Sequence, residues 1–117
     1  MEYATSVIKS CVLGVNVGYV SAHSVSDMFY ILRRDLNVEE RRETIKFICS
    51  YFSVVCENKE DFLSAIEADY SKDMEDSLQM HCANKLQLDY IVTRNVKDFG
   101  LSPVRAISAE DFLLSNR

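Results

Sequence analysis

Short β-prone segments alternate along the chain with longer amphipathic segments, and this alternation most limits the folds open to it. The β-prone segments lie at residues 17–22, 53–56, 90–94 and 103–107. Helical patterns of ten residues or more lie between most of them. Strands that alternate with helices of this length favour an α/β architecture, in which parallel strands are joined by right-handed crossovers.

Polar residues that can cap a helix mark several predicted helix starts. Ser24 with Asp27 three residues later resembles a capping box, and Asn37, Asn58 and Asp73 precede further helical patterns. The predicted helices cover residues 3–13, 24–36, 73–87 and 109–115, with two more that begin near 37 and 58. The apolar positions expected to face inward in those two are Ile45, Ile48, Cys49, Phe52, Phe62, Leu63, Ile66 and Tyr70.

The bulk composition is that of an ordinary globular domain. The chain has 117 residues, of which 48% are hydrophobic and 26% charged, and one proline and three glycines leave no room for a linker. No apolar run approaches the ~18 residues of a membrane span, and no signal-peptide pattern is visible. We therefore expect one domain over residues 1–117 that is cytoplasmic and does not associate with a membrane.

The four cysteines, Cys11, Cys49, Cys56 and Cys82, are widely spaced and match no metal-binding pattern. This spacing favours reduced thiols that are mostly buried over a disulfide framework. The net charge of −5 argues against a large electropositive surface for nucleic acid, though not against a small one. The two basic pairs, at residues 33–34 and 41–42, fit a solvated helix face better than a phosphate clamp.

Polar side chains are placed where parallel strands end and neighbouring helices begin. In an α/β unit the helices run antiparallel to the strands, so the start of the helix at residue 73 lies at the same sheet edge as the end of the strand at residues 90–94. This carboxyl edge is where open α/β sheets bind ligands. The side chains expected there are Asp27, Asp73, Glu75, Asp76, Thr93, Asn95 and Asp98.

Asp76 is the most informative of these acids. At roughly 100° per residue it falls between Met80 and Ala83 on the helix surface, on a face that is otherwise apolar. A carboxylate on such a face is costly unless it is paired, hydrogen-bonded or bound to a cation. Asp76 is therefore a candidate functional residue.

Each of the other acids also has a purely structural interpretation. Asp27 can be the acid of a capping box, Asp73 can be a helix-start acid, and Glu75 can be solvated. Asn95 and Asp98 are both common in turns. Only their coincidence at one edge indicates a site, because no single residue is sufficient.

A cluster of carboxylates without cysteine or histidine ligands suits Mg²⁺ or Mn²⁺ rather than zinc. Such ions can deprotonate a water and neutralise a phosphodiester, which is the chemistry of metal-dependent nucleases. His81 lies on the polar side of its helix and His23 just before a helix cap. We read both as incidental, because neither has a nearby acid and nucleophile in a triad-like pattern.

Three segments together resemble the PIN-domain proteins of the bacterial toxin type. They are YVSAHSVSDMFYILRR at 19–34, DMEDSLQMHCANKLQLDYIVTRNVKDF at 73–99 and VRAISAEDFL at 104–113. The resemblance runs from about Tyr3 to Leu114. It implies a three-layer α/β/α fold around a parallel sheet and Mg²⁺- or Mn²⁺-dependent RNA cleavage, often as the toxin of a toxin–antitoxin pair.

The resemblance also assigns roles by position. The catalytic residues that it implies are Asp27, Asp76, Asn95 and Asp98. The three acids would hold the metal, and Asn95 is the polar residue of the T-R-[DN] element. Two neighbours would orient the bound phosphate or water, and they are Thr93 and Arg94. RNA would be the substrate, and an antitoxin protein is an expected partner.

One departure from the family pattern is large. PIN domains usually begin with a central strand that carries an Asp and a following T-N pair, and this chain starts with what resembles the helix after that strand. The absent carboxylate is expected to weaken metal binding, because charge count tunes affinity at oxygen sites. The strands on either side would be left with open edges, which either close on each other or pair with a second copy in a homodimer.

Three functional readings therefore stay open. The first is an active or residually active PIN-type ribonuclease. The second is a catalytically inactive PIN remnant that acts as a protein-binding or dimerising module. The third is a longer protein in which the missing strand lies upstream of Met1.

Overall fold

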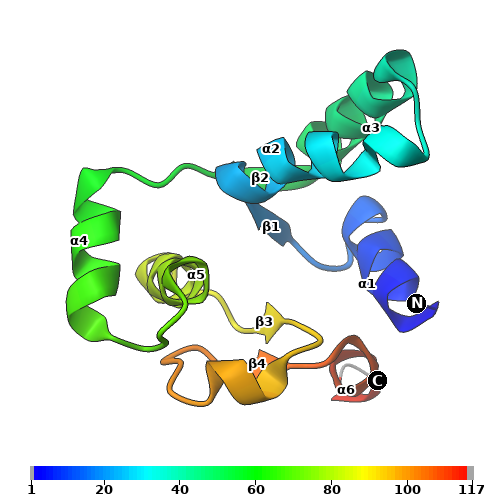
Figure 1. Cartoon of the computed structure of the whole chain (residues 1–117). Helices are drawn as coiled ribbons and strands as arrows, with labels where there is room; N and C mark the ends of the chain where they lie inside the picture. Colours follow the sequence, from blue (N-terminus) through cyan, green and yellow to red (C-terminus); the bar gives the residue numbers. More distant parts are fainter. Residues whose placement is uncertain (1, 116–117) are drawn as a thin grey trace. The chain divides into compact units, whose positions relative to one another are not determined.

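Six α-helices and four short strands alternate in the computed structural model, which describes residues 2–115 (Figure 1). The helices are α1 (Glu2–Val12), α2 (Ala22–Ile31), α3 (Val38–Tyr51), α4 (Lys59–Ala68), α5 (Met74–Lys85) and α6 (Ala109–Ser115). The strands are β1 (Gly18–Ser21), β2 (Phe52–Val55), β3 (Ile91–Val92) and β4 (Ala106–Ile107). Two 3₁₀ turns complete the order, η1 (Leu32–Arg34) and η2 (Val96–Phe99). All four predicted strands and all six predicted helices are present, and η2 is an element that the sequence did not indicate.

The strands pair in parallel, as the alternation of elements predicts. β1 pairs with β2, with Gly18 opposite Phe52 and Ser21 opposite Val55, and β3 pairs with β4. Within the described residues these are two separate two-stranded sheets. The mixed α/β class is thus confirmed, whereas the three layers and the absent central strand stay predictions.

The described chain divides into two compact units, and each is treated by itself below. One unit contains residues 2–7 and 57–115, and the other contains residues 8–56. The division falls inside α1 and again just after β2. We call the first the C-terminal unit and the second the hairpin unit, because α2 and α3 form a helical hairpin closed by η1 (Figure 1).

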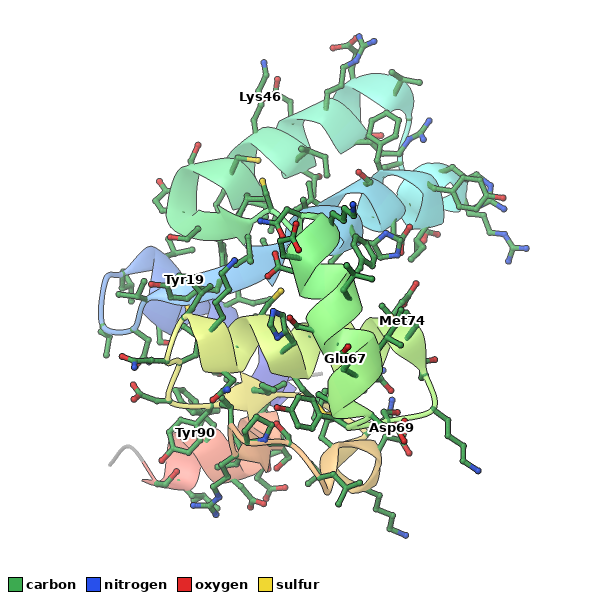
Figure 2. All side chains as sticks on the ribbon, turned by 90° about the vertical axis from the view of Figure 1, so that its left-hand side faces the viewer. Tyr19, Lys46, Glu67, Asp69, Met74 and Tyr90 are labelled. Atoms are coloured by element: carbon green, nitrogen blue, oxygen red, sulfur yellow. The ribbon has the colours of Figure 1, made fainter. Side chains whose placement is uncertain are left out.

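The hydrophobic core belongs to the C-terminal unit and is built around α5. Tyr90, which directly precedes β3 and is labelled in Figure 2, packs edge-to-face on Phe112 of α6 with ring centroids 5.6 Å apart. The apolar side chains that are buried among the described residues all lie on α4, α5, η2, β4, α6 and the segment before β4. They are Ala65, Leu78, Met80, Cys82, Ala83, Phe99, Val104, Ile107 and Phe112.

Helix caps are the local feature that the sequence predicts best. Asn37 and Asn58 each form a capping box, in which the N-cap side chain accepts from a backbone N–H and an acid three residues on accepts from the N-cap N–H. Asp73 caps α5 through the Asp76 N–H. The predicted cap at Ser24 is wrong: α2 begins one turn earlier, and Ser21 is its N-cap and accepts from the Ser24 N–H at 3.1 Å.

The predicted inward face of α4 is also wrong. Phe62, Leu63 and Ile66 are exposed, while Asp61 and Ala65 are buried. The cause is a polar contact between α4 and α5, in which Asp61 bonds to side chains of α5. The face of α4 that meets α5 is therefore the one that carries Asp61 and Ala65, about one residue around the helix from the apolar stripe. In α3 the positions Ile45 and Ile48 are half-buried as expected, but Cys49 is exposed. Phe52, expected on the same helical stripe, is half-buried but begins β2.

All four cysteines are free thiols, as predicted, yet Cys82 alone is buried. Cys49 and Cys56 are exposed and Cys11 is half-buried, so the expectation of mostly buried thiols is wrong. Burial and the nearby Asp61 carboxylate raise the pKa of Cys82 to about 11, so this thiol stays protonated at neutral pH. None of the helices in the described part of the chain has the length and apolar character needed to span a membrane.

Candidate acidic metal site

The first turn of α5 is held in place by a buried serine. Ser77 is 2% exposed, and its hydroxyl accepts from the Ser71 N–H at 3.0 Å and lies 3.3 Å from the Ser71 carbonyl oxygen. The Ser71 hydroxyl in turn accepts from the Asp73 N–H at 3.1 Å. These bonds fold the segment before α5 over its first turn and fix Asp73, which then accepts from the Asp76 N–H at 3.0 Å.

Asp76 sits half-buried on the turn that this network builds, next to the buried residues Met80 and Ala83. The helical-surface argument for this residue is thus confirmed. Burial raises the pKa of Asp76 above its usual range, and the negative charges of Asp73, Asp98 and Glu75 raise it further. The carboxylate therefore lies among three other acids, and no basic side chain of the described residues forms an ion pair with it.

Asp98 reaches this group because η2 packs against α5. Phe99 is buried and anchors η2, and the Asp98 N–H donates to the Asn95 carbonyl oxygen at 2.9 Å, which closes the turn. Upstream, the Thr93 N–H donates to the Ile107 carbonyl oxygen at 3.0 Å and ties the end of β3 to β4. The start of α5 and the end of β3 therefore do carry acids to one place, as the parallel topology predicts.

The remaining predicted residues form the turn between β3 and η2. The Thr93 hydroxyl accepts from the Asn95 N–H at 3.1 Å, which leaves its own O–H free to donate elsewhere. Asn95 occupies the N-cap position of η2, but its side chain makes no capping bond there. Arg94 and Asn95 are both exposed. The structure thus places Thr93, Arg94 and Asn95 within five residues of Asp98 on one short turn.

The donor set of this unit fits a hard divalent cation. Carboxylates of Asp76 and Asp98, with Asp73 and Glu75 beside them, offer oxygen ligands and no sulfur or imidazole. A cation relieves the repulsion that neighbouring acids exert on the Asp76 carboxylate, and Mg²⁺ and Mn²⁺ prefer such oxygen ligands. The residues present are therefore compatible with the metal that the sequence predicts.

Asp27 belongs to the hairpin unit and has a different environment. It is exposed, and its Oδ2 lies 3.1 Å from Nε2 of His23, one turn earlier on α2. Because α2 begins at Ala22, Asp27 lies in its second turn, so it is neither a capping acid nor a first-turn residue as predicted. His23 lies in the first turn of α2 and not before its cap, so the expected position of this residue is wrong. That Asp27 is catalytic stays a prediction.

Sequence reasoning missed one polar cluster of the C-terminal unit. Asp61 is 2% exposed, and its Oδ1 lies 2.9 Å from His81 Nε2 and 3.0 Å from Lys85 Nζ on α5. The Asn58 backbone N–H, which donates to Asp61 Oδ2, holds the pKa of Asp61 down to about 2 against the opposing effect of burial, and His81 and Lys85 lower it further. His81 therefore has an acid partner after all. The one local signal was Asn58, three residues before Asp61, which marks a capping box.

The fold and the site together define a class of protein. It is an α/β chain with parallel strands in which several acids gather at the start of a helix. The sequence profile of the PIN domain matches residues 2–97, which is most of the chain. The chain therefore belongs to the PIN domain family, as its motifs predicted. Comparison with curated proteins and with solved structures finds no match.

Proposed function

We propose that this chain is a metal-dependent ribonuclease that uses Mg²⁺ or Mn²⁺. The observation that carries the proposal is Asp76, a half-buried carboxylate whose pKa is raised by burial and by three neighbouring acids. Among residues 2–115 no basic side chain pairs with it. Membership of the PIN domain family supports nuclease chemistry in particular. A charge arrangement of this kind is costly for the free protein and is relieved when a cation binds.

Asp76 and Asp98 would hold the ion, with Asp27 as a further ligand by family position. A bound divalent ion supplies a polarised water and neutralises charge on the phosphodiester. The Thr93 hydroxyl, whose proton is free, and the exposed Arg94 guanidinium would orient the phosphate. Asn95 contributes no charge, so we expect metal affinity to be modest. Whether as a toxin with an antitoxin partner or alone, the substrate class is RNA.

Calorimetric titration of Mn²⁺ into the 117-residue protein tests the metal site first. We expect saturable binding that is abolished in Asp76→Asn, because this change keeps the shape of the side chain and removes its charge. The matched control is Glu67→Gln on α4, which removes one exposed acid outside the group (Figure 2). Binding that survives Asp76→Asn, or no binding at millimolar Mn²⁺, would contradict the proposal.

Cleavage of a labelled RNA tests the second half of the proposal. We expect Mn²⁺-dependent cleavage by the wild type and by Glu67→Gln, and a loss of at least about a hundredfold in Asp76→Asn, because the metal organises the reacting phosphate. Cleavage that is unaffected by a chelator would show a different chemistry.

The alternative function, a protein-binding or dimerising module, is favoured by one observation. No side chain of residues 8–56 is buried, and several large apolar side chains of this unit are exposed, most of all Leu13, Val15 and Val17. Exposed apolar surface of this extent is typical of interaction sites. Sedimentation velocity over a range of protein concentrations tests it: a monomer at every concentration would exclude the homodimer version.

A further inference from the structure

Two consecutive aromatic residues, Phe29 and Tyr30, lie in the last turn of α2, and an arginine is stacked on each. The Arg33 guanidinium carbon lies 3.7 Å from the centroid of the Tyr30 ring, and Nη1 donates a 3.0 Å hydrogen bond to the Tyr30 carbonyl oxygen. The Arg41 guanidinium carbon lies 4.5 Å from the Phe29 ring centroid, and Nη1 donates to the Phe29 carbonyl oxygen at 3.0 Å. Both arginines are thus fixed over rings by backbone carbonyls at a helix C-terminus, where cations are favoured.

The two stacked pairs differ in their access to solvent. Tyr30 is 63% exposed even with the guanidinium on its ring, and Arg33 and Arg34 are exposed as well. Arg41 is half-buried, and its Nε is buried without a hydrogen-bond partner. We call Tyr30, Arg33 and Arg34 the hairpin-tip patch, because η1 closes the α2–α3 hairpin at the end away from β1 and β2 (Figure 1).

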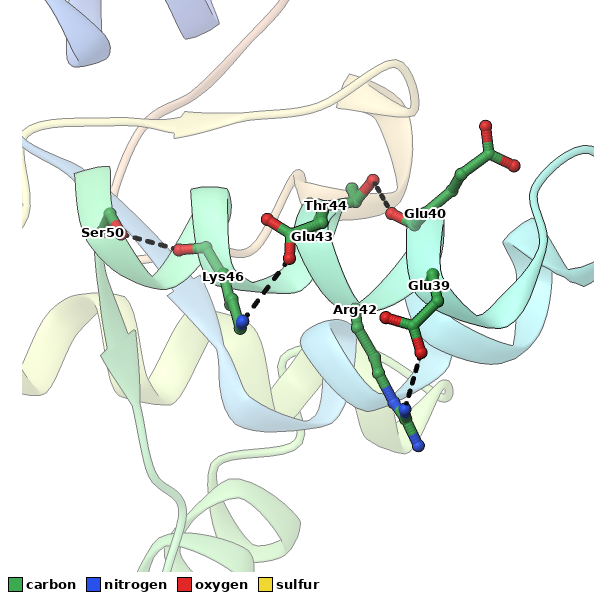
Figure 3. A network of polar contacts seen from close by, with 7 residues as sticks. All are labelled: Glu39, Glu40, Arg42, Glu43, Thr44, Lys46 and Ser50. Carbon is green, nitrogen blue, oxygen red and sulfur yellow. Dashed lines mark hydrogen bonds and ion pairs between the residues drawn. The ribbon is translucent and has the colours of Figure 1, made fainter.

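The charges of the hairpin-tip patch are uncompensated, unlike those further along α3. Arg42 pairs with Glu39 at 3.0 Å and Lys46 with Glu43 at 3.4 Å (Figure 3). Arg33 and Arg34 pair with no carboxylate of the described residues, although Asp35 follows them in sequence. In a chain with a formal net charge of −5, this is a local cationic site that includes an exposed aromatic ring.

We propose that the hairpin-tip patch binds single-stranded RNA, with a base stacked on Tyr30 and phosphates on Arg33 and Arg34. The inference rests on the proposed ribonuclease function and names a surface that holds its substrate. An aromatic ring beside cations is the combination that single-stranded nucleic acids recognise, because every base has a face to stack and every linkage has a phosphate. The planar guanidinium suits phosphate better than an ammonium does.

The position of the patch on α2 extends the argument towards the candidate acid of this unit. Asp27 and Tyr30 are three residues apart on the same helix, so their side chains are neighbours on one face, with Cβ atoms about 5–6 Å apart. A strand of RNA that stacks on Tyr30 therefore passes the Asp27 carboxylate within the hairpin unit. Binding at the patch would hold a scissile linkage close to that residue.

Fluorescence anisotropy with a labelled, unstructured oligoribonucleotide of about a dozen nucleotides tests the patch. The titrations are made with the full chain in EDTA, so that RNA binding is measured without metal or cleavage. We expect Arg33→Ala/Arg34→Ala to weaken binding at least tenfold at low salt and to lower the slope of log affinity against log salt by about 1.4, which is two phosphate contacts on a single strand. We expect Tyr30→Ala to weaken binding about fivefold or more, and Tyr30→Phe to bind like the wild type.

Two control variants separate a site from general electrostatics. Lys46→Ala and Arg42→Ala each remove one positive charge from α3, but these cations are already paired with glutamates. We expect each to change RNA affinity less than twofold. Arg33→Lys keeps the charge and loses the planar stack, so it should keep the salt slope and still weaken binding. Far-UV circular dichroism and thermal melting verify that each variant is folded.

The outcomes distinguish this inference from the proposed function. Asp76→Asn should bind RNA like the wild type and fail to cleave it, so loss of cleavage alone bears on the metal site. Patch variants that bind weakly support the patch even if the wild type cleaves nothing. The inference is overturned if the wild type does not bind RNA at low salt, or if Lys46→Ala weakens binding as much as the double arginine variant does.

Discussion

At the scale of single residues, Asp61 is the group whose removal should cost most stability. Its buried carboxylate accepts from His81, Lys85 and the Asn58 N–H, so Asp61→Asn removes two charge-assisted bonds while it keeps the shape. We expect the free energy of unfolding in urea at pH 7 to fall by about 1–3 kcal/mol. Asp89→Asn, an exposed acid of the same unit, should change it by less than about 0.5 kcal/mol.

The stabilising effect of Asp61 should depend on pH in one direction. Its pKa is about 2 in the folded protein, below the ordinary value of 3.8, so the folded state favours the ionised carboxylate. The stabilisation is therefore complete above about pH 4 and is lost as the pH falls through 2. The difference between the wild type and Asp61→Asn should shrink over this window. A difference that stays constant from pH 5 to pH 2 would show that charge is not its origin.

The ionised Asp76 carboxylate should destabilise the folded protein, in contrast to that of Asp61. Its pKa is raised by burial and by Asp73, Asp98 and Glu75, so ionisation costs the folded protein more than the unfolded chain. At neutral pH, in EDTA, we expect Asp76→Asn to raise the melting temperature by about 2–4 °C. This gain should disappear as the pH falls below the pKa that the Asp76 carboxyl has in the unfolded chain. Millimolar Mn²⁺ should stabilise the wild type and leave the variant unchanged. A lower melting temperature for Asp76→Asn in EDTA would contradict this account.

These two acids also show how far the environment of a residue can be predicted from the sequence. The position of Asp76 between Met80 and Ala83 follows from helical periodicity alone, and the structure confirms it. Asp61 could not be found in this way, because its partners His81 and Lys85 stand 20 and 24 residues away on another helix. Its apolar neighbours Phe62 and Leu63 gave the stronger periodic signal, and that signal pointed to the wrong face.

At the scale of elements, the approach of α1, β1 and β2 depends on Gly18. A Cβ built there would lie 2.5 Å from two ring carbons of Phe52 and 2.9 Å from the Cys11 sulfur. We expect Gly18→Ala to destabilise the protein by about 1–3 kcal/mol in urea unfolding, since the ring must move out of a packed position. The double variant with Phe52→Leu should recover part of the loss, because the shorter side chain frees that space.

Gly100→Ala is the matched control for this change. Its nearest neighbour would be the Lys97 carbonyl oxygen at 3.5 Å, which is ordinary contact, and its backbone has φ −61°. Alanine should therefore be neutral or stabilise by up to about 1 kcal/mol, through the unfolded chain. If the two glycine variants lose equal stability, close packing at Gly18 is not the reason.

Element boundaries were predictable where their signal is local. Asn37, Asn58 and Asp73 cap the helices expected of them because a cap needs only residues three positions apart. The start of α2 was misplaced because Ser21 and Ser24 are both acceptable caps, and only the end of β1 decides between them. The 3₁₀ turn η2 is short and lies close after β3, so its residues show no helical periodicity that is separate from the strand pattern.

At the scale of the whole molecule, the parallel pairing was predictable and the completeness of the sheet was not. Alternating elements imply parallel neighbours, and both observed pairs are parallel. Which strand edges stay open depends on contacts between residues far apart in sequence, and periodicity carries no information about those contacts. Two-stranded sheets are marginal by themselves, so each pair depends on its helices or on a further strand.

The open edge of β3 gives a prediction that can be measured one amide at a time. The Ile91 N–H donates to the carbonyl oxygen of Arg105, just before β4, at 2.9 Å, and the Thr93 N–H donates to that of Ile107 at 3.0 Å. By the alternation of a parallel strand the Val92 N–H therefore faces the other edge. No described residue pairs with that edge, and Val92 is 42% exposed. In hydrogen exchange followed by NMR at low protein concentration, we expect the Val92 amide to exchange faster than those of Ile91 and Thr93.

Raising the protein concentration then shows what covers this edge. If a second copy adds a strand, the Val92 amide becomes protected as dimer forms, while Ile91 and Thr93 change little because their bonds to β4 already exist. Protection of Val92 that equals its neighbours at every concentration, in a protein that sediments as a monomer, would mean that the same chain closes the edge. In that case the homodimer is excluded and the exposed backbone of β3 is not available to any partner.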